Sequence, residues 1–389
     1  FTNASATQGR FQDLEILNAS AGGVRFNSDV VVVGNVVLGA ASPINVADTN
    51  GARTATIGGN LVDALGNRWR PTNTLFTGTP SLPASLQTNV TFSGAAMLAG
   101  GFTLTGDLAV SSTGNLTLNG FKVTASGNST TSGGGALTMT NVSDTLDING
   151  SASFAGAAGT LSNGVILLAG NFTQTGTTSF APTGPQRVVL DGSGTQSISF
   201  ANTTNSFFRR LDIAKPAGTQ VMLNTNVRAG AVRFAGFNAV TLTGVAGPPL
   251  SRLLVDSILG QSTSSSIASP LVIDWAGNTG SLLDSGNINV DTLVATGTTQ
   301  SIPRFGPGFG TYTYQSLRIG QQSGTVASIA ATPFPIGNDL VISSGSLQPN
   351  GAKVAVTGNL RTEGTGFLRM NNALDSVGVG VNATFAGGS

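Results

Sequence analysis

Three polar side chains form the best candidate site for carbohydrate chemistry in this chain. Asn287, Asn289 and Asp291 alternate with apolar residues, so in a β-strand they would lie on one face. A polysaccharide lyase or hydrolase needs clustered carboxylates, or a basic residue, on one exposed sheet face. In such an enzyme, replacing Asp291 or Asp274 would remove activity. The alternative, which we favour, is a solvated polar face or an asparagine ladder that joins successive coils of a β-stack.

The absence of two residue types limits the chemistry further. The 389-residue chain contains no histidine and no cysteine. It therefore lacks the side chain most often used for proton transfer near neutral pH, and it can form neither a thiolate zinc site nor a disulfide framework. We predict that the protein is not an enzyme, with carboxylate-only catalysis as the remaining route.

Acidic residues are too scattered to suggest a metal site. The chain has 17 Asp and Glu, without a cluster dense enough to supply six oxygen ligands to calcium. The Gly-Gly-x-Gly-x-Asp nonapeptide of calcium-binding β-helix repeats is also missing. We predict no metal and no cofactor.

Aromatic side chains are the other candidates, because they can stack on sugar rings. Trp69, Phe309, Tyr312 and Tyr314 fall in segments that break the repeat pattern, and the two tyrosines share a face if the chain there is extended. We predict these four as contacts for a glycan or a partner protein. The alternative is that they anchor their loops to the core or fill a partner interface.

These candidates are set in a chain of degenerate repeats. An Asn-Gly dipeptide followed by an alternating apolar run and a second turn recurs at residues 50–61, 119–128, 163–172 and 350–360. Asn-Gly and Gly-Asn supply the positive φ values of tight turns, and the alternation gives each strand one buried face. Gly106 and Gly127 are 21 residues apart, as are Gly337 and Gly358. This spacing suits one coil of a β-solenoid with three short strands and three turns.

Longer stretches also recur. Leu211 and Leu317 are 106 residues apart within matching blocks, and Asp107 and Asp339 are equivalent in two others, which suggests a turn or capping role for both aspartates. We predict one elongated array over residues 1–389. Its cassettes cover approximately residues 8–61, 82–128, 163–244 and 298–368, and its irregular excursions cover residues 68–83, 261–270 and 306–314.

Composition and charge narrow the functional classes. Only 9% of residues are charged, 54 are glycine, and 18 basic residues balance 17 acidic ones. A net charge of +1 lacks the basic excess that is typical of proteins that bind nucleic acids or anionic membranes. No apolar run approaches the roughly 20 residues of a transmembrane helix. Strand and turn formers replace helix formers throughout, so we expect almost no helix.

The sequence of motifs resembles a known class of proteins. GSGTQSI at 192–198, a following Leu-x-Ile block and the Asn-Gly frames resemble the β-strand repeats of large secreted bacterial surface proteins, similar to autotransporter-adhesin passengers and filamentous haemagglutinins. The repeated pattern of strands and turns covers nearly the whole chain, and the specific motifs cover about half of it. The resemblance implies export, a β-solenoid and a role in surface attachment or a surface layer. It supplies no catalytic residues.

Together these observations predict an all-β, right-handed parallel β-solenoid, with tandem β-sandwich domains as the alternative fold. The predicted function is that of a non-enzymatic extracellular or cell-surface structural protein: a surface fibre, a surface-layer unit or an adhesin stalk. Uncapped strand edges favour self-association, or association with other surface proteins or glycans. The alternative function is a β-helix protein that binds or cleaves polysaccharide.

Overall fold

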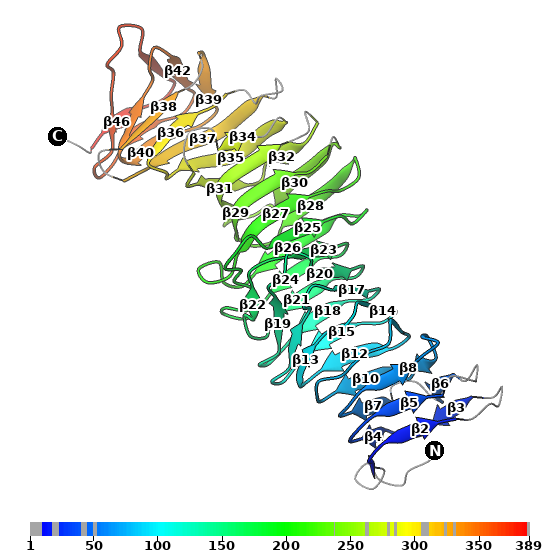
Figure 1. Cartoon of the computed structure of the whole chain (residues 1–389). Coiled ribbons are helices and arrows are strands. Elements are labelled where there is room, and N and C mark those ends of the chain that lie inside the picture. The colour runs from blue at the N-terminus through cyan, green and yellow to red at the C-terminus, as the bar shows by residue number, and fades with distance from the viewer. Residues whose placement is uncertain are drawn as a thin grey trace. The chain divides into compact units, whose positions relative to one another are not determined.

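The computed structural model contains only strands and turns. It describes residues 10–17, 23–39, 45–49, 53–236, 238–260, 264–277, 281–283, 286–304, 311–322, 325–329 and 332–386. Within these residues the strands pair in parallel and stack as a β-solenoid of about 16 turns (Figure 1). The predicted parallel solenoid is confirmed. The alternative of tandem β-sandwiches is wrong, because sandwiches are built from antiparallel sheets. The right-handed sense of coiling stays a prediction.

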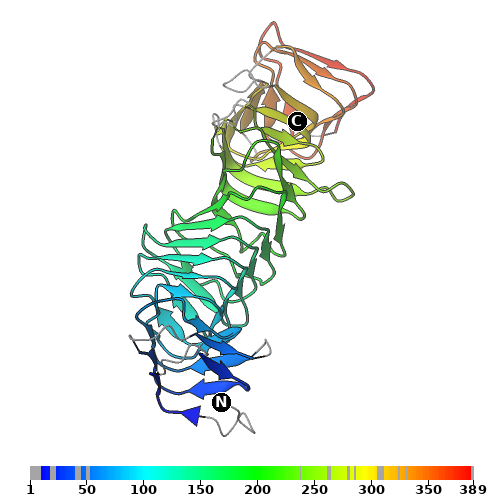
Figure 2. The same ribbon diagram turned by 90° about the vertical axis from the view of Figure 1, so that its right-hand side faces the viewer.

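The chain divides into two compact units. The first comprises Phe1–Val189 with Thr204–Ser206, and the second comprises Leu190–Thr203 with Phe207–Ser389. In both views the strands of each unit lie one above another (Figures 1 and 2).

The strands of the first unit are short. They are β1 (Arg10–Phe11), β2 (Leu14–Ile16), β3 (Val24–Phe26), β4 (Val30–Val32), β5 (Val36–Leu38), β6 (Val46–Asp48), β7 (Thr54–Ile57), β8 (Leu61–Asp63), β9 (Trp69–Arg70), β10 (Asn73–Phe76), β11 (Ser85–Leu86), β12 (Asn89–Phe92), β13 (Ala95–Met97), β14 (Phe102–Leu104), β15 (Leu108–Val110), β16 (Asn115–Thr117), β17 (Lys122–Ala125), β18 (Ser129–Thr131), β19 (Ala136–Met139), β20 (Thr145–Ile148), β21 (Ala152–Phe154), β22 (Thr160–Leu161), β23 (Val165–Leu168) and β24 (Phe172–Gln174).

Several strands of the second unit are longer. After β25 (Arg187–Leu190), which contains the boundary, come β26 (Gln196–Phe200), β27 (Phe208–Ile213), β28 (Thr219–Leu223), β29 (Val227–Phe234), β30 (Val240–Gly244), β31 (Arg252–Gly260), β32 (Ser266–Ala268), β33 (Val272–Trp275), β34 (Leu282–Leu283), β35 (Asn287–Ala295), β36 (Thr299–Ile302), β37 (Tyr312–Gly320), β38 (Val326–Ile329), β39 (Phe334–Ile336), β40 (Leu340–Ser344), β41 (Ser346–Gln348), β42 (Lys353–Val356), β43 (Leu360–Thr362), β44 (Phe367–Leu368), β45 (Ser376–Val379) and β46 (Ala383–Phe385).

A coil in the middle of the first unit has three strands and three corners. β14, β15 and β16 pair in register with β17, β18 and β19 of the next coil. Leu108 lies opposite Ser129, 21 residues later, and the Gly127 amide donates to the Gly106 carbonyl at 3.0 Å. The coil length expected from the glycine spacing is therefore confirmed here.

Apolar side chains alternate into the centre of each coil. In β42, Val354 and Val356 are buried, whereas Lys353 and Ala355 face outward. Rings stack between neighbouring coils in the same way, with Phe76 and Phe92 centroids 5.6 Å apart in the first unit. Each short strand has only one apolar face, and the coils above and below cover it.

Asn-Gly corners adopt the backbone that the sequence predicts. Asn119 and Gly120 have φ values of 55° and 89°, and Asn350 and Gly351 have 56° and 85°. Both pairs thus lie in the left-handed region that glycine and asparagine tolerate best.

Parts of the predicted irregular excursions form strands of the solenoid. Residues 68–83 include β9 and β10, which are paired strands of the solenoid, because Pro71 falls between the two strands and interrupts neither. Within residues 261–270, β32 is also a paired strand. Residues 306–310 lie outside the described part, and Tyr312 already begins β37.

Candidate functional site

The predicted carboxylate and amide face on β35 exists, and its side chains tie coils together. Asn287 and Asn289 are exposed and Asp291 is half-buried, with apolar residues facing inward between them. Asp291 Oδ2 accepts hydrogen bonds from Ser269 Oγ at 2.7 Å and from the Leu271 amide at 2.9 Å. Asn287 Oδ1 accepts from the Thr311 amide at 3.0 Å. These contacts match the ladder alternative.

A second ladder runs along one corner of the first unit. Asp107 Oδ1 accepts from the Asn128 amide at 2.6 Å, and Asn128 Oδ1 accepts from the Ser151 amide at 2.9 Å. In the second unit Asp339 Oδ1 accepts from the Asn359 amide at 2.8 Å. The corner role expected for Asp107 and Asp339 is confirmed: each side chain holds the start of the strand in the next coil.

Two further aspartates secure Asn-Gly corners. Asp144 accepts from the Gly120 amide at 2.5 Å and from the Asn141 amide at 2.9 Å. Asp375 makes the equivalent bonds to Gly351 and Asn372, and these backbone donors lower the pKa of its carboxyl. Asp144 is fully buried, whereas Asp375 is half-buried.

One basic side chain lies in the interior of the second unit. Lys215 is fully buried, and its Nζ donates to the carbonyls of Gly192 and Gly194 and to Gln196 Oε1 at 2.6–2.8 Å. Burial lowers the pKa of Lys215 to about 8, with the charge of Asp191 opposing that shift. Lys215 thus caps the loop carbonyls that precede β26.

The aromatic residues predicted to contact a glycan are placed differently from that prediction. Trp69 is 1% exposed, Tyr312 is 3% exposed and Tyr314 is fully buried. Trp69 Nε1 donates to Thr74 Oγ1 at 2.8 Å and Tyr314 Oη to the Pro303 carbonyl at 2.8 Å. Burial raises the pKa of Tyr314. These rings fill the core and cannot stack on a sugar, so for them the prediction is wrong. Phe309 lies outside the described residues.

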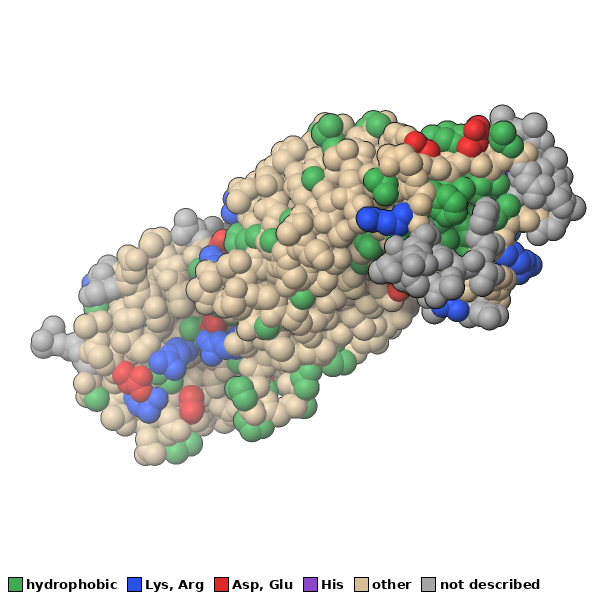
Figure 3. Space-filling model, turned by 90° about the horizontal axis from the view of Figure 1, so that it is seen from below, with side chains coloured by type: hydrophobic (Ala, Val, Ile, Leu, Met, Phe, Trp, Pro, Cys, Tyr) green, Lys and Arg blue, Asp and Glu red, His purple; other side chains and the backbone are tan. Residues whose placement is uncertain are grey.

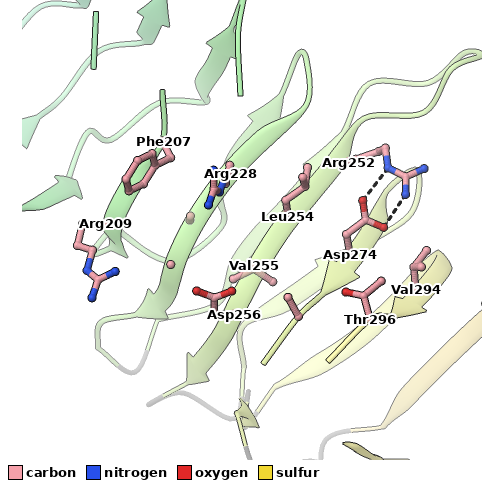
Figure 4. A pocket seen from close by; sticks show the side chains of 13 residues that line it. Phe207, Arg209, Arg228, Arg252, Leu254, Val255, Asp256, Asp274, Val294 and Thr296 are labelled. Atoms are coloured by element: carbon pink, nitrogen blue, oxygen red, sulfur yellow. Dashed lines mark hydrogen bonds and ion pairs between the residues drawn. The ribbon is translucent and has the colours of Figure 1, made fainter. Parts of the chain in front are cut away.

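Charged side chains are sparse on the surface, and several gather in one groove. On the face shown in Figure 3 most of the surface is uncharged. The groove, of about 430 Å³, crosses β27, β29, β31, β33 and β35 of the second unit (Figure 4). Its lining consists of Phe207, Arg209, Arg228, Ala229, Gly230, Arg252, Leu254, Val255, Asp256, Asp274, Ala276, Val294 and Thr296.

Strand register explains why the groove is hollow. The pairings on either side of Gly230 place it between Arg209 of β27 and Asp256 of β31. A Cβ on Gly230 would lie 2.8 Å from the Arg209 carbonyl oxygen and 3.9 Å from Asp256 Oδ2. The same row continues to Ala276, just after β33. The small residues thus leave a gap between larger outward side chains.

The charges in the groove differ in how they are paired. Arg252 holds Asp274 with two hydrogen bonds of 2.6 and 2.8 Å (Figure 4). The Arg228 guanidinium lies over the Phe207 ring, 5.1 Å from its centroid. Within the described part of the chain, Arg209 and Asp256 make no side-chain hydrogen bond or ion pair.

Sequence reasoning missed this groove, although it named Asp274. The lining residues are spread over residues 207–296 and meet only through the coil register. Their spacing is the one available signal, since outward charges recur at intervals close to one coil.

Comparison with known proteins identifies no relative of the chain. No family model, no curated protein and no solved structure matches the chain. The fold and the geometry of its sites therefore carry the functional argument.

The described residues hold neither a metal-binding cluster nor a membrane-spanning helix. No group of three His, Cys, Asp or Glu side chains within the described ranges is placed to hold a metal ion. The same residues include no helix of the length and apolarity that crossing a bilayer requires.

Proposed function

We propose that the chain is a non-enzymatic structural protein of the cell exterior, built as a surface fibre, a surface-layer unit or the stalk of an adhesin. The observation that carries this proposal is the use of its polar side chains. Asp107, Asp144, Asp291 and Asp339 each accept backbone hydrogen bonds from another coil or corner. Chemistry-bearing groups thus serve the stack, as a scaffold requires. The sequence resemblance to secreted bacterial adhesins supports an extracellular setting and an adhesin-like role.

A turnover screen tests the non-enzymatic part. Purified protein incubated with neutral and anionic polysaccharides is expected to release no reducing ends and no unsaturated products. Turnover that Asp291→Asn or Asp274→Asn abolishes would favour the alternative, a polysaccharide-cleaving β-helix enzyme. Antibody labelling of intact and permeabilised source cells tests the location. Labelling that is seen only after permeabilisation would contradict a place on the cell exterior.

Self-association is part of the same proposal. The coil that contains β45 and β46 exposes Leu374, Val381 and Phe385 at 63–74%. Exposed apolar side chains and strand edges of this kind favour association with another β-rich surface, and we propose a second copy of the chain as the partner.

Sedimentation velocity over a concentration series tests the assembly. The wild-type chain is expected to associate with rising concentration, and Phe385→Asp to reduce association. Met97→Asp is the matched control, because Met97 is also 63% exposed but lies on β13. A wild-type monomer at every concentration would show self-association to be wrong.

A further inference from the structure

The groove on β27–β35 is chemically unlike the rest of the surface. Five of its 13 lining residues are charged, in a chain where 9% of residues are charged. Arg209, Arg228 and Arg252 are balanced by Asp256 and Asp274. Charges that served solubility alone would be spread over the surface, so their concentration in this groove suggests a binding role.

Two of these charges take no part in the side-chain hydrogen bonds and ion pairs of the described residues. Arg209 and Asp256 are exposed and, among the described residues, unpaired with any other side chain. They lie two strands apart with Gly230 between them, a separation of roughly 10 Å at the usual strand spacing. The two side chains form no ion pair with each other, and the space over Gly230 that separates them is wide enough for one sugar ring with its substituents.

The groove floor restricts the kind of ligand. Its strands are paired on both sides, so a peptide cannot add as a further strand. Two carboxylates beside three arginines give a net charge of only +1 in the groove, which disfavours a nucleic-acid backbone. Leu254, Val294 and Ala276 supply apolar contacts between the charged groups.

We propose that this groove binds an acidic saccharide, a chain that contains hexuronate residues. The Arg209 guanidinium holds the sugar carboxylate through its two parallel donors. The Asp256 carboxylate accepts hydrogen bonds from ring hydroxyls. Arg228, fixed over Phe207, and Arg252, fixed by Asp274, line the path of neighbouring sugar units. The inference goes beyond the scaffold role and does not depend on it.

Calorimetric titration of the full chain with an oligogalacturonate tests the proposal. The wild type is expected to bind, and Arg209→Ala to weaken binding about tenfold or more, since a charge-assisted hydrogen-bond pair is lost. Arg209→Lys keeps the charge without the fork and should bind between the two. Arg361→Ala, an arginine on the outer face of β43 with a 53% exposed side chain, is the matched control and should bind as wild type.

Asp256→Ala separates saccharide recognition from simple attraction of anions. If Asp256 accepts hydroxyl hydrogens, its loss weakens oligogalacturonate binding. If it only repels anions, its loss strengthens that binding, and the proposal is wrong. Dextran sulfate and neutral dextran are the comparison probes, and binding to either as tight as to the uronate would also overturn it. None of these outcomes alters the sedimentation or turnover results that test the scaffold role.

Discussion

Interior polar residues of the second unit occupy matching places in two cassettes. Lys215 and Gln321 are 106 residues apart and equivalent in sequence. Lys215 Nζ bonds Gln196 Oε1, whereas Gln321 Nε2 donates to Gln300 Oε1 at 3.2 Å. The same buried position therefore accepts a charged or a neutral donor, provided that each polar atom finds a partner.

The ionisation of Lys215 should make stability depend on pH. Its pKa is about 8 in the folded chain and 10.5 in a model peptide, so the unfolded chain binds more protons between these values. Stability consequently rises with pH across this window, by about 3 kcal/mol if the full difference is realised. Lys215→Gln should remove this rise. Urea unfolding of both proteins from about pH 7.5 to 10.5, a range that spans the two pKa values, measures this rise. If the free energy of unfolding of the two proteins changed with pH in parallel, the low pKa of Lys215 would be contradicted.

Asp144 and Asp375 form a matched pair for testing the corners. Asp144→Ala leaves the Gly120 and Asn141 amides without the acceptor that a fully buried carboxylate supplies, which should cost about 1–3 kcal/mol. Asp375→Ala should cost less, because Asp375 is only half-buried and water can reach the amides that it leaves. Amide hydrogen exchange of the segments around Gly120 and Gly351 measures both losses. Equal effects would show that burial does not set the strength of these bonds.

At the scale of elements, strands of three or four residues depend on their neighbours. β12 pairs with β10 on one side and β15 on the other, and Phe92 is fully buried against Phe76. A strand this short has too few hydrogen bonds to persist alone. Its stability comes from apolar contact between coils.

Phe92→Ala should therefore destabilise the first unit strongly. Truncating a buried phenylalanine typically costs about 3–5 kcal/mol, and Phe92→Leu should cost less because more of the volume is kept. Met97→Ala, at an exposed position of β13, is the control and should change little. Thermal unfolding measures the series, and a loss for Phe92→Ala no larger than for the control would contradict the stacking account.

At the scale of the whole molecule, each coil contacts mainly the coils next to it, so stability is close to a sum of local terms. The two tryptophans report on different units, since Trp69 lies in the first and Trp275 in the second. Trp69→Phe and Trp275→Phe each leave one fluorescent reporter.

Phe92→Ala should shift the denaturant transition reported by Trp69 more than the one reported by Trp275. The reason is that the loss of stability is expected to affect mainly the coils adjacent to Phe92. The comparison uses Phe92→Ala in each single-tryptophan background. Equal shifts in both reporters would mean that the chain unfolds as one cooperative unit.

The amino-acid sequence by itself determined the local features of this protein. Asn119-Gly120 and Asn350-Gly351 form tight corners, and β42 alternates as expected, because turn backbone and strand periodicity depend on adjacent residues. The 21-residue coil followed from equivalent glycines in the same way.

Only the tertiary structure decided what lies inside and what meets between coils. Paired residues are 16 apart between β10 and β12 but 26 apart between β29 and β31, so coil length varies and register cannot be counted along the chain. Stacking therefore placed Trp69 and Tyr314 in the core, formed strands in parts of the predicted excursions and brought Arg209, Gly230 and Asp256 together. Burial and long-range contact are properties of the stack, which no local pattern contains.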